Sequence, residues 1–247
     1  MPVGKPFIEL LEVDSTNNYA MAQVQAALAV HGTAWFAHKQ TSGKGQRGKT
    51  WLSKEKENII LSLAINPSPL TVSNQFVVSA VTALACAELL KRYTDKDIKI
   101  KWPNDIYCVD RKAGGILIEN IIQGQQLKFS IVGIGININQ TVFSADVPNA
   151  TSLAEVTGKQ YDPVVLAGEL CVIFEKKWSL IEEGGFDKIL FDYQQHLYKL
   201  NEIVKFKFEN EVLLAKVVGV NAQGELILNT GEQITIPVSQ ITWLLPN

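Results

Sequence analysis

Four β-rich segments follow one another closely between residues 98 and 138, and this succession constrains the fold more than any other feature of the chain. The segments cover residues 98–102, 106–109, 116–122 and 127–138, and turn residues occupy 110–111 and 123–124. Parallel neighbours need a crossover of about a dozen residues, whereas antiparallel neighbours are joined by short turns. The spacing therefore predicts antiparallel pairing.

Helical and further β-rich segments lie on both sides of this run. Residues 7–12, 33–38 and 58–65 are typical of strands, and Asp14 or Ser15 offers an N-cap for a helix that reaches about residue 30. An almost wholly apolar helix is predicted over residues 72–93, and helical structure over residues 149–198. The predicted class is α+β, with helices packed on a mixed, mainly antiparallel sheet.

The sequence pattern changes after Leu200. Residues 202–245 hold about five short strand candidates, separated in part by turn residues at 221–224 and 230–231. This pattern is typical of a small β-barrel, in which Trp243 is interpreted as a packing residue. We therefore expect two domains, residues 1–199 and residues 200–247.

Composition limits the functions that need to be considered. Hydrophobic residues make up 47% of the chain, charged residues 19%, and the net charge is −2. A dedicated nucleic-acid binder would carry a basic surplus, so any anion site must be local. The N-terminus does not resemble a signal peptide, and no run approaches the ~18 apolar residues of a membrane span, so a cytoplasmic location is expected. Cys86, Cys108 and Cys171 are predicted to be reduced core thiols.

The segment GKGQRGKT at residues 43–50 matches the phosphate-binding pattern G-x-x-x-x-G-K-[ST]. A true P-loop joins a buried strand directly to a helix whose N-terminus faces the phosphates. Here polar residues 39–42 precede the first glycine, and residues 51–58 show no apolar helical stripe. We interpret the segment as a basic glycine loop that binds phosphate through backbone N–H groups and side-chain charge.

Four other stretches place polar groups or glycines at the ends of predicted elements. They are DSTN at 14–17, KWPND at 101–105, RKAGGIL at 111–117 and GIGIN at 133–137. The two glycines of GIGIN lie on one face of a strand and permit close approach of a ligand or backbone. Each stretch has a purely structural alternative, namely a helix cap, a packing crossing or a solvated Lys112. Their joint occurrence favours a single site.

With these motifs in this order, the chain resembles the biotin protein ligases, specifically the single-function kind without an N-terminal DNA-binding domain. The resemblance covers nearly the whole length and rests on residues 14–17, 40–51, 101–105, 110–115 and 132–137 and on the C-terminal barrel. It implies a class II synthetase-like catalytic domain followed by an SH3-like β-barrel.

The same resemblance implies substrates and partners. The substrates would be biotin and ATP with Mg²⁺, and the acceptor a biotin carboxyl carrier protein of acetyl-CoA carboxylase or a related biotin-dependent carboxylase. No DNA and no membrane partner is implied, and a homodimer is left open. Such ligases join the biotin carboxylate to ATP, giving biotinyl-5′-adenylate and pyrophosphate, and then transfer the biotinyl group to one lysine of the carrier.

Roles for individual residues also follow from the resemblance. The biotin-binding residues would be Ser15, Thr16, Asn17, Gln40, Gly43, Lys44, Gly45, Gln46, Lys112, Gly114 and Gly115. The ATP-binding residues would be Lys44, Arg47, Lys49, Trp51, Asn104, Lys112 and Asn137, with Trp51 stacked on adenine and with Asn104 and Asn137 holding the nucleotide and its metal. Catalytic roles would fall to Lys112, Arg47 and Asp105, and no set of protein metal ligands is assigned.

The chemistry explains why these residue types are needed. The biotin carboxylate is already ionised at pH 7, so the first step needs no base, but the repulsion between two anions must be suppressed by cations. In the second step the acceptor amine, with an ordinary pKa of ~10.4, must lose a proton. Asp105 is the candidate to orient or deprotonate that amine, and a turn-forming role is its alternative.

One position departs from the family pattern. The glycine loop of these ligases often reads Gly-Arg/Lys-Gly-Arg-Arg-Gly, and Gln46 occupies the fourth position here. A charged group over the adenylate would then be missing, so we expect weaker retention of the adenylate.

Three other functions stay open from the sequence. A lipoate ligase would use a related fold and the same adenylation chemistry on a different acid. A P-loop nucleotidase would hydrolyse ATP without biotin. A non-enzymatic adaptor that uses the C-terminal barrel would show no nucleotide dependence.

Overall fold

The computed structural model describes residues 1–124, 126–144, 147, 149–209, 211–238 and 240–245. Its helices are α1 Thr16–Gln25, α2 Phe76–Lys91, α3 Leu153–Thr157, α4 Pro163–Glu182 and α5 Phe186–Gln195, with short 3-10 helices η1 Gln46–Gly48 and η2 Val72–Asn74. Its strands are β1 Phe7–Leu10, β2 Ala34–Ala37, β3 Asn58–Ile65, β4 Ile98–Lys101, β5 Asp105–Cys108, β6 Arg111–Gln123, β7 Gln126–Asn137, β8 Ile203–Phe208, β9 Glu211–Val220, β10 Leu226–Asn229, β11 Gln233–Ile236 and β12 Ile241–Leu244.

Seven strands form the large sheet, in the order β1-β2-β3-β7-β6-β5-β4. The β1 and β2 strands pair in parallel, and every other neighbouring pair is antiparallel. The strands β4 to β7 are neighbours both in sequence and in the sheet because short turns join them. The predicted α+β class with a mixed, mainly antiparallel sheet is confirmed.

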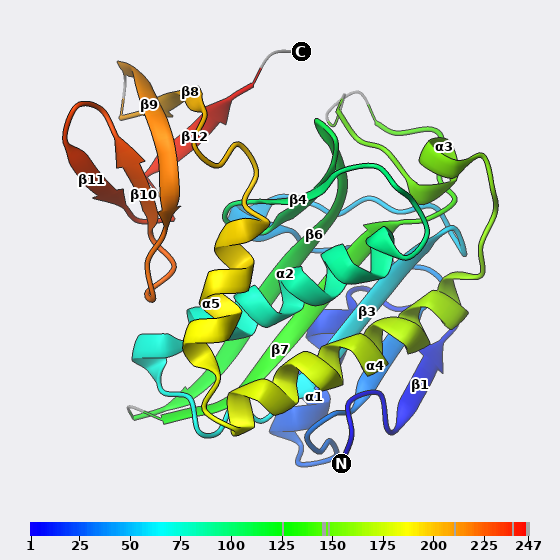
Figure 1. Cartoon of the computed structure of the whole chain (residues 1–247). Helices are drawn as coiled ribbons and strands as arrows, with labels where there is room; N and C mark the ends of the chain where they lie inside the picture. Colours follow the sequence, from blue (N-terminus) through cyan, green and yellow to red (C-terminus); the bar gives the residue numbers. More distant parts are fainter. Residues whose placement is uncertain (125, 145–146, 148, 210, 239, 246–247) are drawn as a thin grey trace.

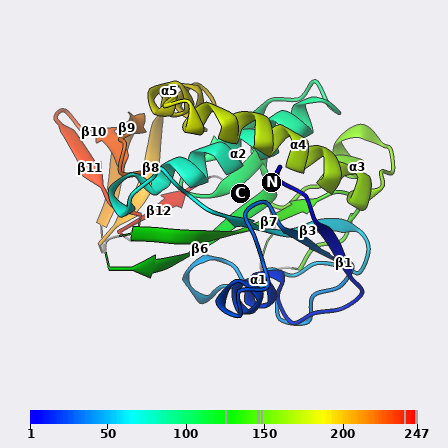
Figure 2. The same cartoon turned by 90° about the horizontal axis from the view of Figure 1, so that it is seen from below.

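Helices cover both faces of the large sheet. The α2, α4 and α5 helices lie on one side and α1 on the other (Figures 1 and 2). The α2 helix packs on β4 to β7 and is also covered by α4 and α5, which explains why its side chains are almost all apolar. Residues 72–91 are long and apolar enough to cross a membrane, but 67% of that window is buried in the fold. We therefore identify this segment as a core helix.

Several predicted boundaries differ from the structure. The first helix ends at Gln25 rather than near residue 30, because Ala27 has a positive φ of 56° that a helix does not permit. The helical region after residue 149 consists of three helices, with left-handed glycines at Gly158 and Gly184 after α3 and α4. The strand predicted from residue 116 begins at Arg111, so the basic pair lies within β6 rather than before it.

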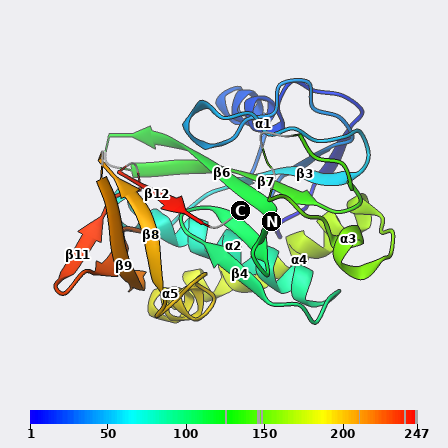
Figure 3. The ribbon, with the colours of Figure 1, turned by 90° about the horizontal axis from the view of Figure 1, so that it is seen from above.

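Five strands form the C-terminal sheet, in the order β11-β10-β9-β8-β12. All four ladders are antiparallel, which confirms the predicted all-β character of this part of the chain. The sheet stands at one end of the molecule (Figure 3). It is joined to the rest by two indole hydrogen bonds, from Trp102 to the Gly224 carbonyl (2.8 Å) and from Trp243 to the Trp102 carbonyl (3.0 Å). The division at residue 199/200 stays a prediction, since one hydrophobic core cluster includes residues from both sides of it.

The three cysteines are buried and free, as predicted. Cys86 lies on α2, Cys108 on β5 and Cys171 on α4. Burial raises the pKa of the Cys171 thiol to about 12 and that of Cys86 further still. Both thiols therefore act as small apolar side chains.

Candidate functional site

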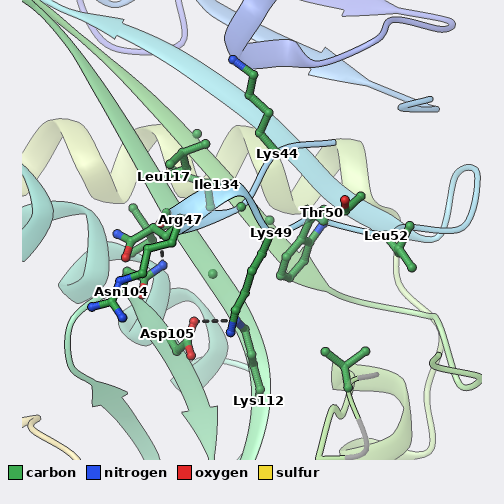
Figure 4. Close-up of a pocket in the computed structure, with 18 of the residues that line it drawn as sticks. Lys44, Arg47, Lys49, Thr50, Leu52, Asn104, Asp105, Lys112, Leu117 and Ile134 are labelled. Atoms are coloured by element: carbon green, nitrogen blue, oxygen red, sulfur yellow. Dashed lines mark hydrogen bonds and ion pairs between the residues drawn. The ribbon is translucent and has the colours of Figure 1, made fainter. Parts of the chain in front are cut away.

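A cavity of about 780 Å³ collects the predicted motifs from distant parts of the chain. This volume lies in the range of small-molecule sites. Among the residues singled out from the sequence, its lining includes Ser15, Thr16, Asn17, Gln40, Lys44, Gly45, Gln46, Arg47, Lys49, Trp51, Asn104, Asp105, Lys112, Gly115 and Asn137. Gly43 and Gly114 are not part of the lining. Figure 4 shows several of these side chains together.

The start of α1 brings three polar residues to the cavity. Ser15 is the N-cap residue, yet its side chain makes no capping hydrogen bond, so capping alone does not account for this serine. Ser15, Thr16 and Asn17 are all buried, with exposed fractions of 1%, 4% and 3%. All three line the cavity, so a ligand there would lie beside buried hydroxyl and amide groups.

A buried hydrogen-bond network holds the polar end of the cavity. The Gln40 side-chain oxygen accepts from the Thr16 amide (2.8 Å) and hydroxyl (3.1 Å). Ser62 on β3 places its hydroxyl 2.8 Å from Thr16 Oγ1 and 2.6 Å from Asn17 Oδ1. Sequence reasoning missed Ser62, although a serine inside the apolar strand NIILSLAI is a visible signal, since that strand is buried along its whole length.

The glycines of β6 and β7 give room to side chains from other segments. A Cβ atom on Gly133 would lie 2.4 Å from Asn17 Oδ1, and one on Gly135 would lie 2.5 Å from the Trp51 indole. Gly115 also faces the Trp51 ring, at 3.2 Å from such an atom. The Gly-x-Gly strand therefore serves close approach of Asn17 and Trp51, as the alternation of strand faces predicts.

Gly43 and Gly114 support the site from outside the lining. A Cβ atom on Gly43 would lie 2.4 Å from the Trp51 carbonyl oxygen, and one on Gly114 would lie 2.9 Å from the Gly135 carbonyl oxygen. Both positions require glycine because backbone passes close to them. Direct ligand contacts by these two residues stay a prediction.

The basic glycine loop does not have P-loop architecture. An antiparallel bridge joins Lys44 to Thr50, and between them the chain makes only the short turn η1. Arg47 within that turn has a positive φ of 57°. The next regular element is β3, so no helix N-terminus follows Lys49 and Thr50. The segment is therefore not a P-loop, as predicted, and phosphate binding by the loop stays a prediction.

Cations gather at the other end of the cavity around one carboxylate. Lys112 Nζ lies 2.5 Å from Asp105 Oδ1, and Lys101 Nζ lies 3.8 Å from Asp105 Oδ2. Lys49 extends toward the same group, and Arg47 and Asn104 lie beside it (Figure 4). Lys112 is thus neither fully exposed nor merely solvated, because only 28% of its side chain is accessible and its ammonium also lies 5.8 Å from the Trp51 ring.

Lys101 is the most enclosed of these cations, with 14% of its side chain exposed. Its ammonium lies 5.2 Å from the centre of the Tyr107 ring and 5.6 Å from that of Trp243. Burial lowers the pKa of Lys101, and the charge of Asp105 opposes that effect. The aromatic faces and the carboxylate together favour the charged form.

The C-terminal sheet contributes directly to the cavity wall. Ile241, Thr242 and Trp243 of β12 line it together with Trp102. Trp243 is therefore more than a packing residue of the C-terminal sheet. The sequence pattern could not reveal this, because it says nothing of which outside segment an edge strand meets.

Hydrogen bonds from two asparagines and from the segment after β7 hold the strands β5 and β6, on which Asp105 and Lys112 lie. Asn104 Nδ2 donates to the Ile116 carbonyl (2.9 Å), and Asn137 Nδ2 donates to the Thr151 carbonyl (3.0 Å). The backbone of Lys112 also bonds to the Asn149 carbonyl and the Thr151 amide. These bonds leave the amide oxygens of both asparagines as acceptors near the cavity.

A second carboxylate, Glu119 on β6, was not singled out from the sequence. Its Oε2 accepts from Asn17 Nδ2 (2.9 Å), and its Oε1 lies 3.4 Å from Lys44 Nζ. The Lys44 side chain accordingly points away from the group formed by Arg47, Asp105 and Lys112 (Figure 4). Lys44 therefore faces the polar end of the cavity.

The arrangement suits a neutral polar group at one end and a polyanion at the other. Hydroxyl and amide groups can match a small ligand that has both donors and acceptors. Lysines and an arginine in a partly enclosed space stabilise charge that develops between two reacting anions.

Family models match both parts of the chain. A model of the Biotin/lipoate A/B protein ligase family matches residues 10–137, and a model of the Biotin protein ligase C terminal domain matches residues 199–241.

Curated relatives and solved structures give the same picture. The Bifunctional ligase/repressor BirA of Bacillus spizizenii is 31% identical over 212 residues, which cover 83% of this chain but only 64% of the relative. The biotin–[acetyl-CoA-carboxylase] ligase of Paracoccus denitrificans is 28% identical over 246 residues, covering 94% of this chain and 98% of the relative. The structure of a biotin protein ligase from Aquifex aeolicus in complex with biotin and ATP superposes with a TM-score of 0.80 at 29% identity, covering 96% of this chain and 97% of that chain.

Proposed function

The chain belongs to the Biotin/lipoate A/B protein ligase family, and from this premise we propose that it is a biotin protein ligase. It activates biotin with ATP to biotinyl-5′-adenylate and transfers the biotinyl group to a lysine of a biotin carboxyl carrier protein. One observation carries the proposal: a single cavity joins the buried network of Thr16, Asn17, Gln40 and Ser62 to the cations around Asp105.

Biotin binds with its ureido group at the polar end of the cavity. That group presents two N–H donors and one carbonyl acceptor, which hydroxyl and amide side chains can match. Asn17 is suited to accept from a ureido N–H, because its nitrogen already donates to Leu117 and Glu119, whereas its oxygen accepts from Ser62 and has a second lone pair. The valeryl chain then runs toward Lys112, past Leu117 and Ile134 of the lining.

The first step is the formation of the adenylate. A carboxylate oxygen of biotin forms a bond to the α-phosphorus of ATP, the bond to the β-phosphate oxygen breaks, and pyrophosphate leaves with the electron pair. Lys112, Arg47 and Lys49 reduce the repulsion between the two anions and stabilise the charge of the transition state. Trp51 offers an aromatic surface for adenine beside Lys112.

A Mg²⁺ ion bound to the triphosphate would be held beside the residues of this site. Within the described residues no three His, Cys, Asp or Glu side chains are grouped as a metal site, so phosphate oxygens and water would supply most of the ligands. The amide oxygens of Asn104 and Asn137 and the carboxylate of Asp105 are the protein oxygens suited to complete the shell. The ion supplies additional positive charge to the phosphates.

The second step transfers the biotinyl group. The acceptor lysine nitrogen forms a bond to the acyl carbon, the bond from that carbon to the phosphate oxygen breaks, and AMP leaves with the electron pair while the nitrogen loses a proton. Asp105 is the carboxylate at this end of the cavity, and its oxygens face Lys112 and Lys101 in the structure. A phosphate that attracts Lys112 frees one of these oxygens for the acceptor ammonium.

The proposal also covers the acceptor protein, the cellular location and the oligomeric state of the enzyme. The acceptor is the carrier protein or domain of acetyl-CoA carboxylase, the enzyme in the name of the Paracoccus relative, or of a related biotin-dependent carboxylase. The enzyme acts in the cytoplasm, without DNA or membrane as a partner. Whether it forms a homodimer is to be measured by its mass in solution.

Pyrophosphate exchange tests the function directly. The purified protein is mixed with Mg²⁺-ATP and radiolabelled pyrophosphate, and label in ATP is measured with biotin, with lipoate and with no acid. We expect exchange with biotin alone, because reversible adenylation requires the acid that the cavity accepts. Exchange with lipoate alone would assign the lipoate branch of the family, and ATP loss without either acid would contradict acid activation altogether.

Replacing Gln46 by arginine should slow adenylate release. Gln46 lines the cavity at the start of η1, and an arginine there adds a charge-assisted hydrogen bond to the adenylate phosphate. Such a bond corresponds to about tenfold slower dissociation. A chase of labelled adenylate from the enzyme measures the rate, and Ser42→Arg, an exposed residue outside the lining, is the control. An unchanged rate in Gln46→Arg would remove the idea that Gln46 weakens retention.

A further inference from the structure

We propose that Glu119 is a positioning residue that holds the biotin end of the cavity together, acting through Asn17 and Lys44; the inference rests on the proposed function. Its two carboxylate oxygens have different partners. Oε2 accepts from Asn17 Nδ2 at 2.9 Å, and Oε1 pairs with Lys44 Nζ at 3.4 Å. One side chain of β6 thereby joins the start of α1 to the glycine loop.

The first contact sets the orientation of the Asn17 amide. Asn17 donates both amide hydrogens toward β6, to Glu119 and to the Leu117 carbonyl at 3.3 Å. Its oxygen is consequently turned to Ser62 and to the face of Gly133. A carboxylate can only accept when it is ionised, so it excludes the flipped amide, whose oxygen would face another oxygen. Glu119 and the Leu117 carbonyl together therefore fix the Asn17 amide with its oxygen toward Ser62 and Gly133, and the ionised Glu119 makes the shorter of the two contacts.

The second contact ties the glycine loop to the sheet. Lys44 lies three residues before the positive-φ residue Arg47, in the loop between β2 and β3. Besides the bridge of Lys44 to Thr50, which is internal to the loop, the ion pair to Glu119 connects this part of the loop to β6. Loss of the pair should loosen the loop while leaving the sheet intact, since Glu119 is partly exposed.

The ion pair between Lys44 and Glu119 also determines which cations can reach the phosphates. Gln46 is uncharged, so Lys44 is a candidate to compensate at the phosphate. Its ammonium is held by Glu119 instead, away from Asp105 and Lys112 (Figure 4). Lys44 then contributes to biotin binding, and the charge at the phosphates comes from Arg47, Lys49, Lys101 and Lys112.

Two variants separate the two contacts of Glu119. Glu119→Gln keeps an acceptor for Asn17 but removes the ion pair, whereas Glu119→Ala removes both. We expect the KM for biotin in pyrophosphate exchange to rise about threefold in Glu119→Gln, the scale of a partly exposed ion pair. In Glu119→Ala we expect a rise of about tenfold or more, the scale of a lost hydrogen bond to a charged group. The kcat should change less than the KM in both variants, because Glu119 does not touch the reacting atoms.

Loop protection supplies a readout that does not depend on activity. Trypsin cleavage after Lys44, Arg47 and Lys49, followed by mass spectrometry without ligands, should be faster in both variants than in the unmodified protein. Glu12→Gln is the matched control, since Glu12 pairs with Lys39 at 2.5 Å on the exposed surface before the loop. That variant should match the unmodified protein in both assays.

The outcomes distinguish the inference from the proposed function. If the unmodified protein shows no biotin-dependent exchange, the proposed function fails. If it does exchange but both Glu119 variants keep the biotin KM and the loop cleavage rate, the positioning role is wrong. The positioning role would also be wrong if kcat fell by the same factor as the KM rose and loop cleavage stayed unchanged. A general structural defect would then explain the result.

Discussion

Lys112→Ala should reduce biotin-dependent pyrophosphate exchange at least ~100-fold, the scale found when one preorganised electrostatic stabiliser is removed. Lys112 lies on β6, and its ammonium is held 2.5 Å from Asp105 and beside the Trp51 ring. Its ammonium is therefore already in the cavity before the anions arrive, and it needs only to exchange Asp105 for phosphate as its partner. The loss should appear in kcat as well as in kcat/KM, because the charge is needed most in the transition state.

A lysine in a similar ion pair provides the control. Lys188 on α5 lies 2.5 Å from Asp192, with 63% of its side chain exposed and outside the cavity. Lys188→Ala should leave exchange unchanged, since exposed ion pairs contribute little to stability. Exchange by Lys112→Ala within a few-fold of the unmodified protein would contradict the assigned role of Lys112.

Asp105→Asn should slow transfer from preformed biotinyl-adenylate to the carrier about 100-fold, the scale of losing a positioned acid–base group. The acceptor lysine arrives largely protonated, and the Asp105 carboxylate can attract its ammonium and accept its proton, whereas the neutral amide of asparagine can do neither effectively. A single-turnover assay with isolated adenylate measures this step alone. Pyrophosphate exchange should fall less, because phosphate can replace the carboxylate as the partner of Lys112.

Comparing pyrophosphate exchange with single-turnover transfer shows whether Asp105 acts on the acceptor amine or only positions the lysines. Equal losses in exchange and in transfer would mean that Asp105 only positions Lys112 and Lys101. Normal transfer would exclude a catalytic role. A pH profile adds a separate check: raising the pH deprotonates the acceptor amine, so the defect of Asp105→Asn should shrink as the pH rises toward the ordinary lysine pKa of ~10.4.

Most of the fold could be predicted from local patterns. The strands β1 to β12 lie where apolar residues and turn residues indicate them, although β6 begins five residues earlier than predicted, and short turns determine the antiparallel order of β4 to β7. Helix ends were less accurate. The helix α1 ends at Gln25, before the positive φ of Ala27, whereas the prediction extended it to about residue 30. Residues 149–198, predicted as helical, form three separate helices.

Part of the site could also be predicted, from residue types at element ends and not from periodic patterns. Glycines, lysines, asparagines and aspartates clustered at element ends reveal the chemistry of anion binding, and nearly all of these residues line one cavity. Ser62, Glu119 and Trp243 were missed. They lie within otherwise regular strands, where the pattern explains them as a buried polar residue, an exposed charge and a packing residue.

The sequence by itself determined the class of fold, the antiparallel order of the central strands and the kinds of side chain available for chemistry. The tertiary structure alone decided which carboxylate meets which cation. Asp105 is paired with Lys112 and Glu119 with Lys44 because of strand register and loop path. Periodic patterns report only which face a side chain occupies, whereas an ion pair depends on the separation of atoms that are far apart in the chain.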